Sequence, residues 1–178
     1  MLAILAPAAL GLAAAACDEP RPESYVERTP LAPQRDAPGA PIASPDTTGA
    51  VWQEARGALR YGKPGEAVLM DLACSNGRVF LTRRAPADAG AKAVLALIGN
   101  GKVERLFVDA VPDRSGAEVW HGTFSAGDPR LDVLAGTGRI EATVPGAGSL
   151  ILNGSALPAA YLSRCRAALP PAVPAAPE

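Results

Sequence analysis

Apolar and polar residues alternate in short stretches between residues 51 and 153, and a period of two is typical of β-strands. In residues 139–144 the alternation separates an apolar face from a polar one: Ile140, Ala142 and Val144 against Arg139, Glu141 and Thr143. Residues 118–124 alternate in the same way, with Trp120 and Phe124 on one face and His121 on the other. We therefore expect antiparallel strands that each bury one face.

Turn residues divide these stretches into hairpins. Asn76-Gly77 separates residues 68–74 from 78–84, and Asn100-Gly101 separates 91–98 from 102–109. Asn and Gly both tolerate the positive φ angles that a two-residue hairpin turn requires. A third hairpin joins residues 139–144 to 149–153, and residues 51–56 and 58–61 add one or two strands. The sequence thus predicts a mainly β fold, a small antiparallel barrel or sandwich of about 8–9 strands.

Two short helices complete the prediction. Asp128 is a good cap for a helix near residues 129–135, with Pro129 at its first position. A C-terminal helix is expected near residues 158–168, before Pro170-Pro171. In it Leu157, Tyr161, Cys165 and Ala168 would form one stripe facing the sheet.

The first residues have the composition of an export signal. Residues 2–16 are apolar or small without a break, and Ala14-Ala15-Ala16 directly precede Cys17. This resembles the lipobox of bacterial lipoproteins, in which the cysteine becomes the first mature residue and carries acyl chains such as palmitate. The resemblance implies a signal peptide at residues 1–16, lipidation of Cys17 and a place in the bacterial cell envelope, facing the periplasm on either membrane. Ordinary cleavage after Ala16 and a buried helix of a cytosolic protein are the alternatives.

The mature chain divides by composition into three parts. Residues 17–49 contain seven prolines and few bulky apolar residues, which predicts a disordered spacer after the lipid-anchor cysteine. Residues 50–168 form the β domain, and residues 169–178 are a second proline-rich tail. Cys74 and Cys165 are the two remaining cysteines, and in an oxidising compartment a disulfide between them is expected. Two separately buried thiols are the alternative.

Charge and motifs exclude more functions than they suggest. The net charge of −1 gives no electrostatic footprint for nucleic acid and no basic patch for a membrane surface, so the expected membrane contact is the lipid anchor alone. His121 is the single histidine, and the chain has no metal-binding or cofactor motif and no Gly-x-Ser-x-Gly. We therefore expect no catalytic residue, metal or cofactor. The predicted role is a non-catalytic binding or structural module with an envelope protein as its possible partner; an envelope hydrolase using His121 is an alternative.

A second resemblance offers another alternative. Residues 72–80, Leu-Ala-Cys-Ser-Asn-Gly-Arg-Val-Phe, are similar to the opening of the membrane-bound inhibitors of C-type lysozyme, which are small β-barrel lipoproteins. Ser115-Gly116 is similar to the loop that those proteins insert into the lysozyme cleft. Glu118 and Val119 stand where the family has a basic residue, so Ser115 is the one residue to which the resemblance assigns an inhibitory, binding role.

Overall fold

The fold is an antiparallel sheet of nine strands, described for residues 41–168 in a computed structural model. The predicted signal peptide, Cys17, most of the spacer and the tail at 169–178 lie outside the described residues. The strands are β1 (Val51–Ala55), β2 (Ala58–Gly62), β3 (Met70–Ser75), β4 (Arg78–Pro86), β5 (Lys92–Gly99), β6 (Lys102–Pro112), β7 (Glu118–Ser125), β8 (Ile140–Thr143) and β9 (Ser149–Leu152). The prediction of a mainly β fold with 8–9 strands is confirmed.

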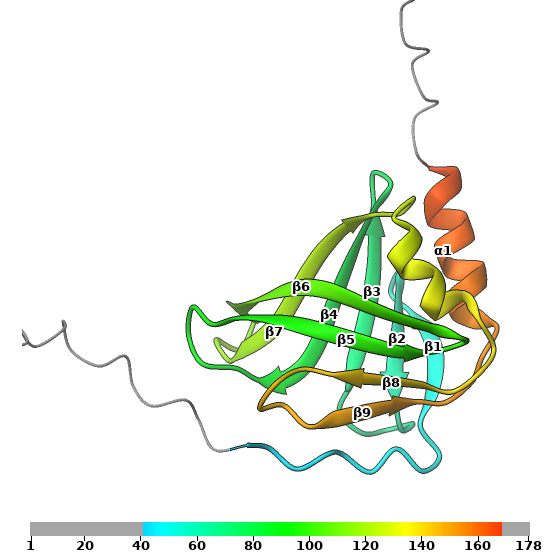
Figure 1. The fold of residues 1–178 in the computed structure, drawn as a ribbon. Helices are drawn as coiled ribbons and strands as arrows, with labels where there is room; N and C mark the ends of the chain where they lie inside the picture. The colour runs from blue at the N-terminus through cyan, green and yellow to red at the C-terminus, as the bar shows by residue number, and fades with distance from the viewer. Residues whose placement is uncertain (1–40, 169–178) are drawn as a thin grey trace, which may run out of the picture. The chain divides into compact units, whose positions relative to one another are not determined.

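One continuous sheet curls into a nearly closed barrel (Figure 1). Its strand order is β1-β2-β3-β4-β7-β6-β5-β8-β9, so β4 pairs with β7 and the β5–β6 hairpin is enclosed between them in the sequence. Of the two predicted architectures, the barrel is therefore the observed one. The predicted Asn-Gly turns are present, since Asn76, Gly77, Asn100 and Gly101 all have positive φ.

The inner face of the barrel is filled by the apolar residues that the alternation predicted. In β8, Ile140 and Ala142 are buried while Glu141 is half-buried on the outer face. In β7, Trp120 and Phe124 point inward and His121 points outward, as expected. The largest fully buried side chains include Tyr61 and leucines of β2 to β6, of β9 and of the 3₁₀ helix η1 (Pro129–Ala135).

Side chains, rather than a strand ladder, join the edge strand β9 to the other end of the sheet. The Tyr61 hydroxyl donates to the Ile151 carbonyl at 2.8 Å and accepts from the Asn153 backbone N–H at 3.0 Å. The Asn153 amide donates to the carbonyls of Thr47 and Ala50 at 3.0 and 2.9 Å. The side chains of Tyr61 and Asn153 therefore connect the two ends of the sheet, where β1 and β9 do not pair.

Residues 41–50 lie against the barrel. The Ile42 N–H donates to the Gly146 carbonyl at 2.8 Å, and the Ser44 hydroxyl accepts from the Ser149 N–H at 2.9 Å. These contacts join residues that composition assigns to the spacer to the β8–β9 hairpin. Composition alone missed this because these contacts are backbone hydrogen bonds that do not require bulky apolar side chains.

Both helices lie at one end of the barrel, where Figure 1 shows α1 (Leu157–Ala167) beside the 3₁₀ helix η1 (Pro129–Ala135). The expected stripe on α1 is only partly correct. Tyr161 and Cys165 are buried, but Leu157 is 38% exposed and Ala168 is exposed. The buried face of the helix consists of Pro158, Tyr161, Leu162 and Cys165, so it is rotated relative to the predicted stripe.

The cap of η1 has the predicted form, and its removal should be measurable. The Asp128 carboxylate accepts from the Arg130 N–H at 2.9 Å, and from the Arg130 guanidinium. We expect Asp128→Ala to lower the free energy of unfolding by about 1 kcal/mol, as loss of an N-cap commonly does. Urea unfolding, monitored by circular dichroism, measures the difference in the free energy of unfolding between the variant and the wild type. Glu66→Ala, at an exposed position between β2 and β3, is the comparison, and an equal loss in both variants would contradict the assignment of a capping role.

The predicted disulfide joins the helical end to the sheet. Cys74 in β3 and Cys165 in α1 are bonded, with their Cα atoms 5.9 Å apart and a sequence separation of 91. The bond holds α1 against the barrel, together with the Tyr161 hydroxyl, which donates to the Gly57 carbonyl at 2.9 Å.

Candidate functional site

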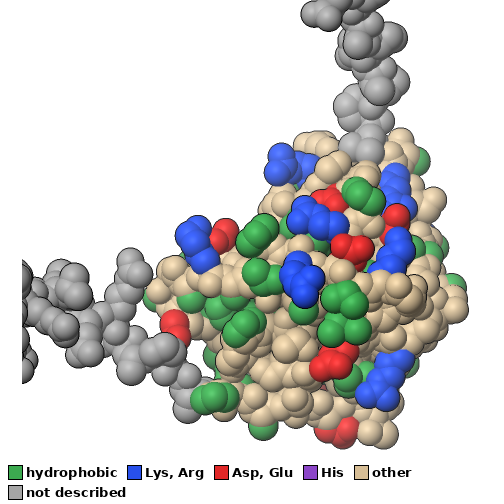
Figure 2. All heavy atoms as spheres, in the orientation of Figure 1, with side chains coloured by type: hydrophobic (Ala, Val, Ile, Leu, Met, Phe, Trp, Pro, Cys, Tyr) green, Lys and Arg blue, Asp and Glu red, His purple; other side chains and the backbone are tan. Residues whose placement is uncertain are grey.

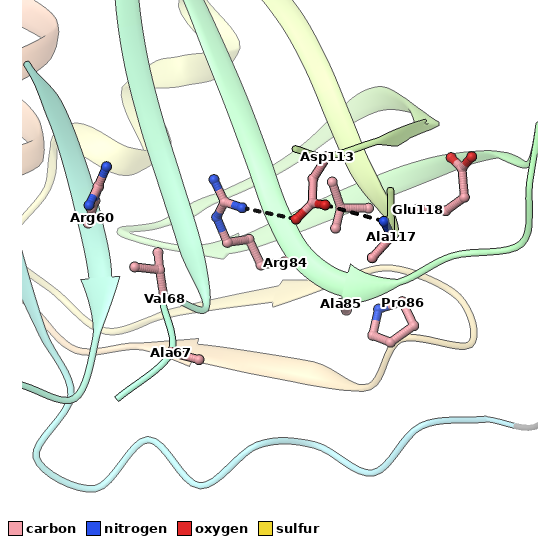
Figure 3. A pocket seen from close by; sticks show the side chains of 10 residues that line it. Arg60, Ala67, Val68, Arg84, Ala85, Pro86, Asp113, Ala117 and Glu118 are labelled. Carbon is pink, nitrogen blue, oxygen red and sulfur yellow. Dashed lines mark hydrogen bonds and ion pairs between the residues drawn. The ribbon is translucent and has the colours of Figure 1, made fainter. Parts of the chain in front are cut away.

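A charged pocket lies at the end of the barrel away from the helices. It occupies about 470 Å³ between β2, the loop before β3, the end of β4 and the β6–β7 connection. Figure 3 shows how side chains from these segments surround it. Its lining includes Arg60, Val68, Arg84, Asp113, Glu118 and Val119. A smaller depression on β1 and β2 shares Arg60 and Val68 with it.

A bulge at the end of β4 shapes the pocket. Arg83 pairs with Trp120 in β7 and Pro86 pairs with Val119, so Arg84 and Ala85 are extra residues on the β4 side. A bulge bends its strand and redirects the side chains beside it. Arg84 consequently lies between two carboxylates: its Nε is 2.5 Å from Asp71 Oδ1, and its Nη1 is 3.7 Å from Asp113 Oδ2 (Figure 3 draws the second contact).

The β6–β7 connection is held by Asp113. Its Oδ1 atom accepts from the Ser115 hydroxyl at 2.6 Å and from the Ser115 N–H at 2.8 Å. These two hydrogen bonds, with Arg84 nearby, hold the pKa of Asp113 below its ordinary value. The carboxylate is therefore ionised throughout the neutral range, and Ser115, although exposed, has its hydroxyl directed to its own turn.

Ser115→Ala is expected to raise the pKa of Asp113 toward the ordinary 3.8, because the hydroxyl donor is the largest cause of the lowered value. The pKa of Asp113 is lower in the folded protein than in the unfolded chain, so the ionised carboxylate stabilises the fold above about pH 4. This contribution is lost as the pH falls through the pKa of the folded protein. Carboxyl ¹³C chemical shifts, titrated in the wild type and the variant, measure it. Ser149→Ala, remote from this turn, should leave Asp113 unchanged; an equal shift in both would contradict the assignment.

Three side-chain polar atoms late in β4 and early in β7 are buried without a hydrogen-bond partner, and of the three residues Glu118 lines the pocket. They are Arg83 Nε, Trp120 Nε1 and Glu118 Oε2, and they are the unsatisfied buried side-chain atoms found in residues 41–168. Arg83 and Trp120 are cross-strand partners, and Glu118 is two residues from Trp120 on the same face of β7. The three side chains therefore start from adjacent positions on the inner face of the sheet.

Arg83 is the most unusual of the three because it is 2% exposed. Its Nη1 donates to the Leu69 carbonyl at 3.1 Å, and its Nη2 lies 3.5 Å from the Ala147 carbonyl. Within residues 41–168 no ion pair joins it to a carboxylate, and burial lowers the pKa of its guanidinium to about 10. A cation buried without a counter-ion costs free energy, so the structure retains an unbalanced positive charge here.

His121 lies elsewhere, on the outer face. Its Nδ1 is 3.3 Å from the Thr82 hydroxyl and its Nε2 is 3.3 Å from the Thr123 hydroxyl. Phe80 stacks beside the ring at 6.1 Å between centroids. Neither depression described above is lined by His121 or Ser115. The structure thus places the two residues of the alternative predictions outside the pocket, and does not bring them together.

The outer face of β5 and β6 carries exposed apolar side chains, seen among the charged ones in Figure 2. Phe107 is 76% exposed and Val103 is 54% exposed. In the part of the chain from residue 41 to 168, no group of three or more histidine, cysteine, aspartate or glutamate residues is placed to hold a metal ion. Over the same residues, the helices are too short and too polar to cross a membrane.

The buried Arg83 and the pocket residue Glu118 were missed in the sequence, although a signal for both was present. Arg83-Arg84 looks like a solvated basic pair, but the period of two puts Arg83 on the inner face with Val79 and Leu81. The same period puts Glu118 with Trp120. No family model, curated protein or solved structure matches this chain in the comparisons.

Proposed function

We propose that this protein is a cell-envelope lipoprotein, anchored through Cys17, whose barrel is a non-catalytic binding module. The pocket between β2, β4 and the β6–β7 connection is its binding site. The observation that carries the proposal is this pocket: charged side chains from separate strands surround it, and the buried Oε2 atom of one of them, Glu118, lacks a hydrogen-bond partner. Unsatisfied buried polar atoms are rare and need a physical explanation, and a bound ligand is one.

The arrangement of carboxylates favours binding over catalysis. A general acid needs a raised pKa and a clear path to substrate, whereas hydrogen bonds and Arg84 lower the pKa of Asp113. Asp71, the other carboxylate beside Arg84, is buried and ion-paired. The His121 ring nitrogens face threonine hydroxyls rather than an acid and a nucleophile.

The disulfide supports the envelope location. Such bonds persist in oxidising compartments and are rare in the cytosol, and Cys74–Cys165 connects the sheet to α1. The anchor is tested by the intact mass of the protein from its native cell fraction. A mature chain beginning at lipidated Cys17 is expected. Cys17→Ser should abolish lipidation, and an unprocessed wild-type chain would overturn the anchor.

The binding role is tested by photo-crosslinking in the full chain. A photoreactive amino acid at Val68 should give an adduct with an envelope component, detected by mass, because Val68 lines the pocket. The same amino acid at Val103, on the outer face of β6, is the control. The absence of any adduct from Val68, or the same adduct from both positions, would overturn the pocket as the binding site.

A further inference from the structure

We propose that the outer face of β6 is a self-association surface, on which a second copy of this chain binds with the two β6 strands antiparallel and face to face. The surface, called here the β6 face, consists of Val103, Arg105, Phe107, Asp109 and Val111. The first four side chains are exposed and Val111 is half-buried. This inference goes beyond the proposed ligand pocket and does not depend on it.

The β6 face carries apolar side chains that the barrel leaves exposed. Leu106 and Val108 of β6 fill the inside of the barrel, so the residues that alternate with them point outward. Phe107 is the most exposed large apolar residue of β6, and Ile98 of β5, directly opposite Val103, is exposed as well. Figure 2 shows hydrophobic side chains among charged ones on this side of the molecule. Apolar side chains gathered on one exposed face are typical of an interaction site.

The order of residue types along the β6 face is symmetric about its centre, except that the charge changes sign. From Val103 to Val111 the outward residues are apolar, basic, aromatic, acidic and apolar, with Phe107 in the middle. Reversal about Phe107 exchanges Arg105 with Asp109 and Val103 with Val111. The β6 face is therefore complementary, in charge and in polarity, to a reversed copy of itself.

A two-fold axis through Phe107, parallel to the sheet and perpendicular to β6, produces this match. In such an isologous contact residue i meets residue j of the second copy, and j meets i. Each Arg105 then faces Asp109 of the second copy, and the two Phe107 rings meet at the axis. A two-fold axis along β6 would instead bring Arg105 against Arg105 and Asp109 against Asp109, where like charges repel. Charge therefore selects the antiparallel arrangement.

Both charged groups have bonding capacity for a second copy. Among residues 41–168, the Arg105 guanidinium has no hydrogen bond or ion pair, and only its backbone carbonyl accepts one, from Arg130. Asp109 bonds Lys92 through Oδ1 at 3.0 Å, and its side chain is 59% exposed. A carboxylate accepts through two oxygens, so Asp109 Oδ2 can accept from an incoming guanidinium.

The same charges argue against an anionic membrane as the occupant. A membrane-binding surface is expected to surround its apolar residues with Lys and Arg. Here Asp109 lies on the β6 face, and Glu141 is the cross-strand neighbour of the exposed Ile98. Carboxylates among the apolar residues would be repelled by anionic headgroups, whereas a second copy supplies an arginine to Asp109.

The size of the β6 face predicts a weak dimer. From Val103 to Val111 it extends over about 27 Å, and with β5 and β7 beside it the contact covers roughly 400 Å² on each copy. Stable interfaces bury about 800 Å² on each partner. We therefore expect a reversible dimer with a dissociation constant in the micromolar range.

A photoreactive phenylalanine derivative at Phe107 tests the contact. Because Phe107 lies on the axis, irradiation of the purified full chain should give an adduct of twice the chain mass, linked close to residue 107 of both copies. The yield should rise as the protein concentration increases from micromolar to millimolar. The same amino acid at Val51, an exposed apolar residue of β1, is the control and should give at most a tenth of this adduct.

Charge reversal tests the pairing of Arg105 with Asp109. Arg105→Asp places two acidic residues together at both symmetry-related contacts, and Asp109→Arg places two basic residues together. Each variant should lower the yield of the homodimer adduct about tenfold or more, because opposed like charges disfavour association. The double variant restores opposite charges and should recover the wild-type yield. Arg56→Asp makes the same change of charge at an exposed position in the β1–β2 turn and should have no effect.

Four results would overturn the inference. Equal homodimer yields from Phe107 and Val51 would indicate chance encounters, and no homodimer adduct from Phe107 would exclude the contact. An adduct with lipid or with a different protein alone would assign another occupant to the β6 face. Single reversals with the wild-type yield, or a double variant without recovery, would exclude the two-fold pairing. None of these results changes the envelope adduct expected from Val68, which tests the pocket separately.

The pocket experiment gives an independent reading of the same contact. Its control position, Val103, lies on the β6 face and should give the homodimer adduct, whose mass differs from that of an envelope adduct.

Discussion

Replacing Cys74 and Cys165 together by alanine is expected to lower the free energy of unfolding by about 4 kcal/mol, because the bond closes a long loop in the unfolded chain. The loop extends over 91 residues of sequence, from β3 to α1. In the chain-entropy account, restricting so long a loop removes many unfolded conformations. Urea unfolding of the variant and the wild type, followed by tryptophan fluorescence, measures the difference.

The matched control is the wild type under reducing conditions, which should unfold at nearly the urea concentration of the double variant. A difference below about 1 kcal/mol between oxidised and reduced wild type would contradict the prediction. The described contacts of α1 explain why the folded structure should survive the loss. Tyr161 and Leu162 are buried against the barrel, and the Arg166 guanidinium bonds the Ala126 carbonyl at 2.8 Å.

Tyr61→Phe is expected to cost about 2 kcal/mol of unfolding free energy, since it leaves a partly buried carbonyl and a partly buried N–H without their partner. The tyrosine is fully buried, and its hydroxyl bonds both Ile151 and Asn153. Burial raises the pKa of this phenol, so it stays protonated and able to donate at neutral pH. Removing it opens the contact between β2 and β9, and amide hydrogen exchange in β9 should accelerate.

Tyr161→Phe is the comparison for this prediction. Its hydroxyl makes one described hydrogen bond, to the Gly57 carbonyl, so about 1 kcal/mol is expected. It should also leave hydrogen exchange in β9 unchanged. Equal costs for the two variants, or unchanged exchange in Tyr61→Phe, would contradict the role of Tyr61 in joining the two ends of the sheet.

The local elements of this fold could be predicted because each depends on neighbouring residues. Asn76-Gly77 and Asn100-Gly101 take the positive φ angles of tight hairpin turns, and Asp128 caps η1 through Arg130. The turn at Arg56-Gly57 has the same positive φ angles, but arginine rarely adopts them, so its residue type did not identify the turn.

Features that depend on distant parts of the chain were not predictable in this way. The pairing of β4 with β7 and the contact of Tyr61 with Ile151 join residues separated by many others, and no local pattern specifies them. The pocket depends on the bulge at Arg84 and Ala85, which adds residues to one strand without changing the alternation up to Arg83. The disulfide was an exception, since only two cysteines remained after Cys17.

The segment that lies along β9 has a consequence for aggregation. An edge strand presents unpaired backbone groups that can pair with another molecule and extend the sheet. Here residues 41–50 lie beside this edge: Ser44 accepts from the Ser149 N–H of β9, and Ile42 donates to the Gly146 carbonyl in the turn before β9. Pro41 and Pro45 in that segment have no N–H to donate, so the covering chain is itself a poor template for a further strand. We therefore expect the segment to protect part of the free edge of the barrel from pairing with a second molecule.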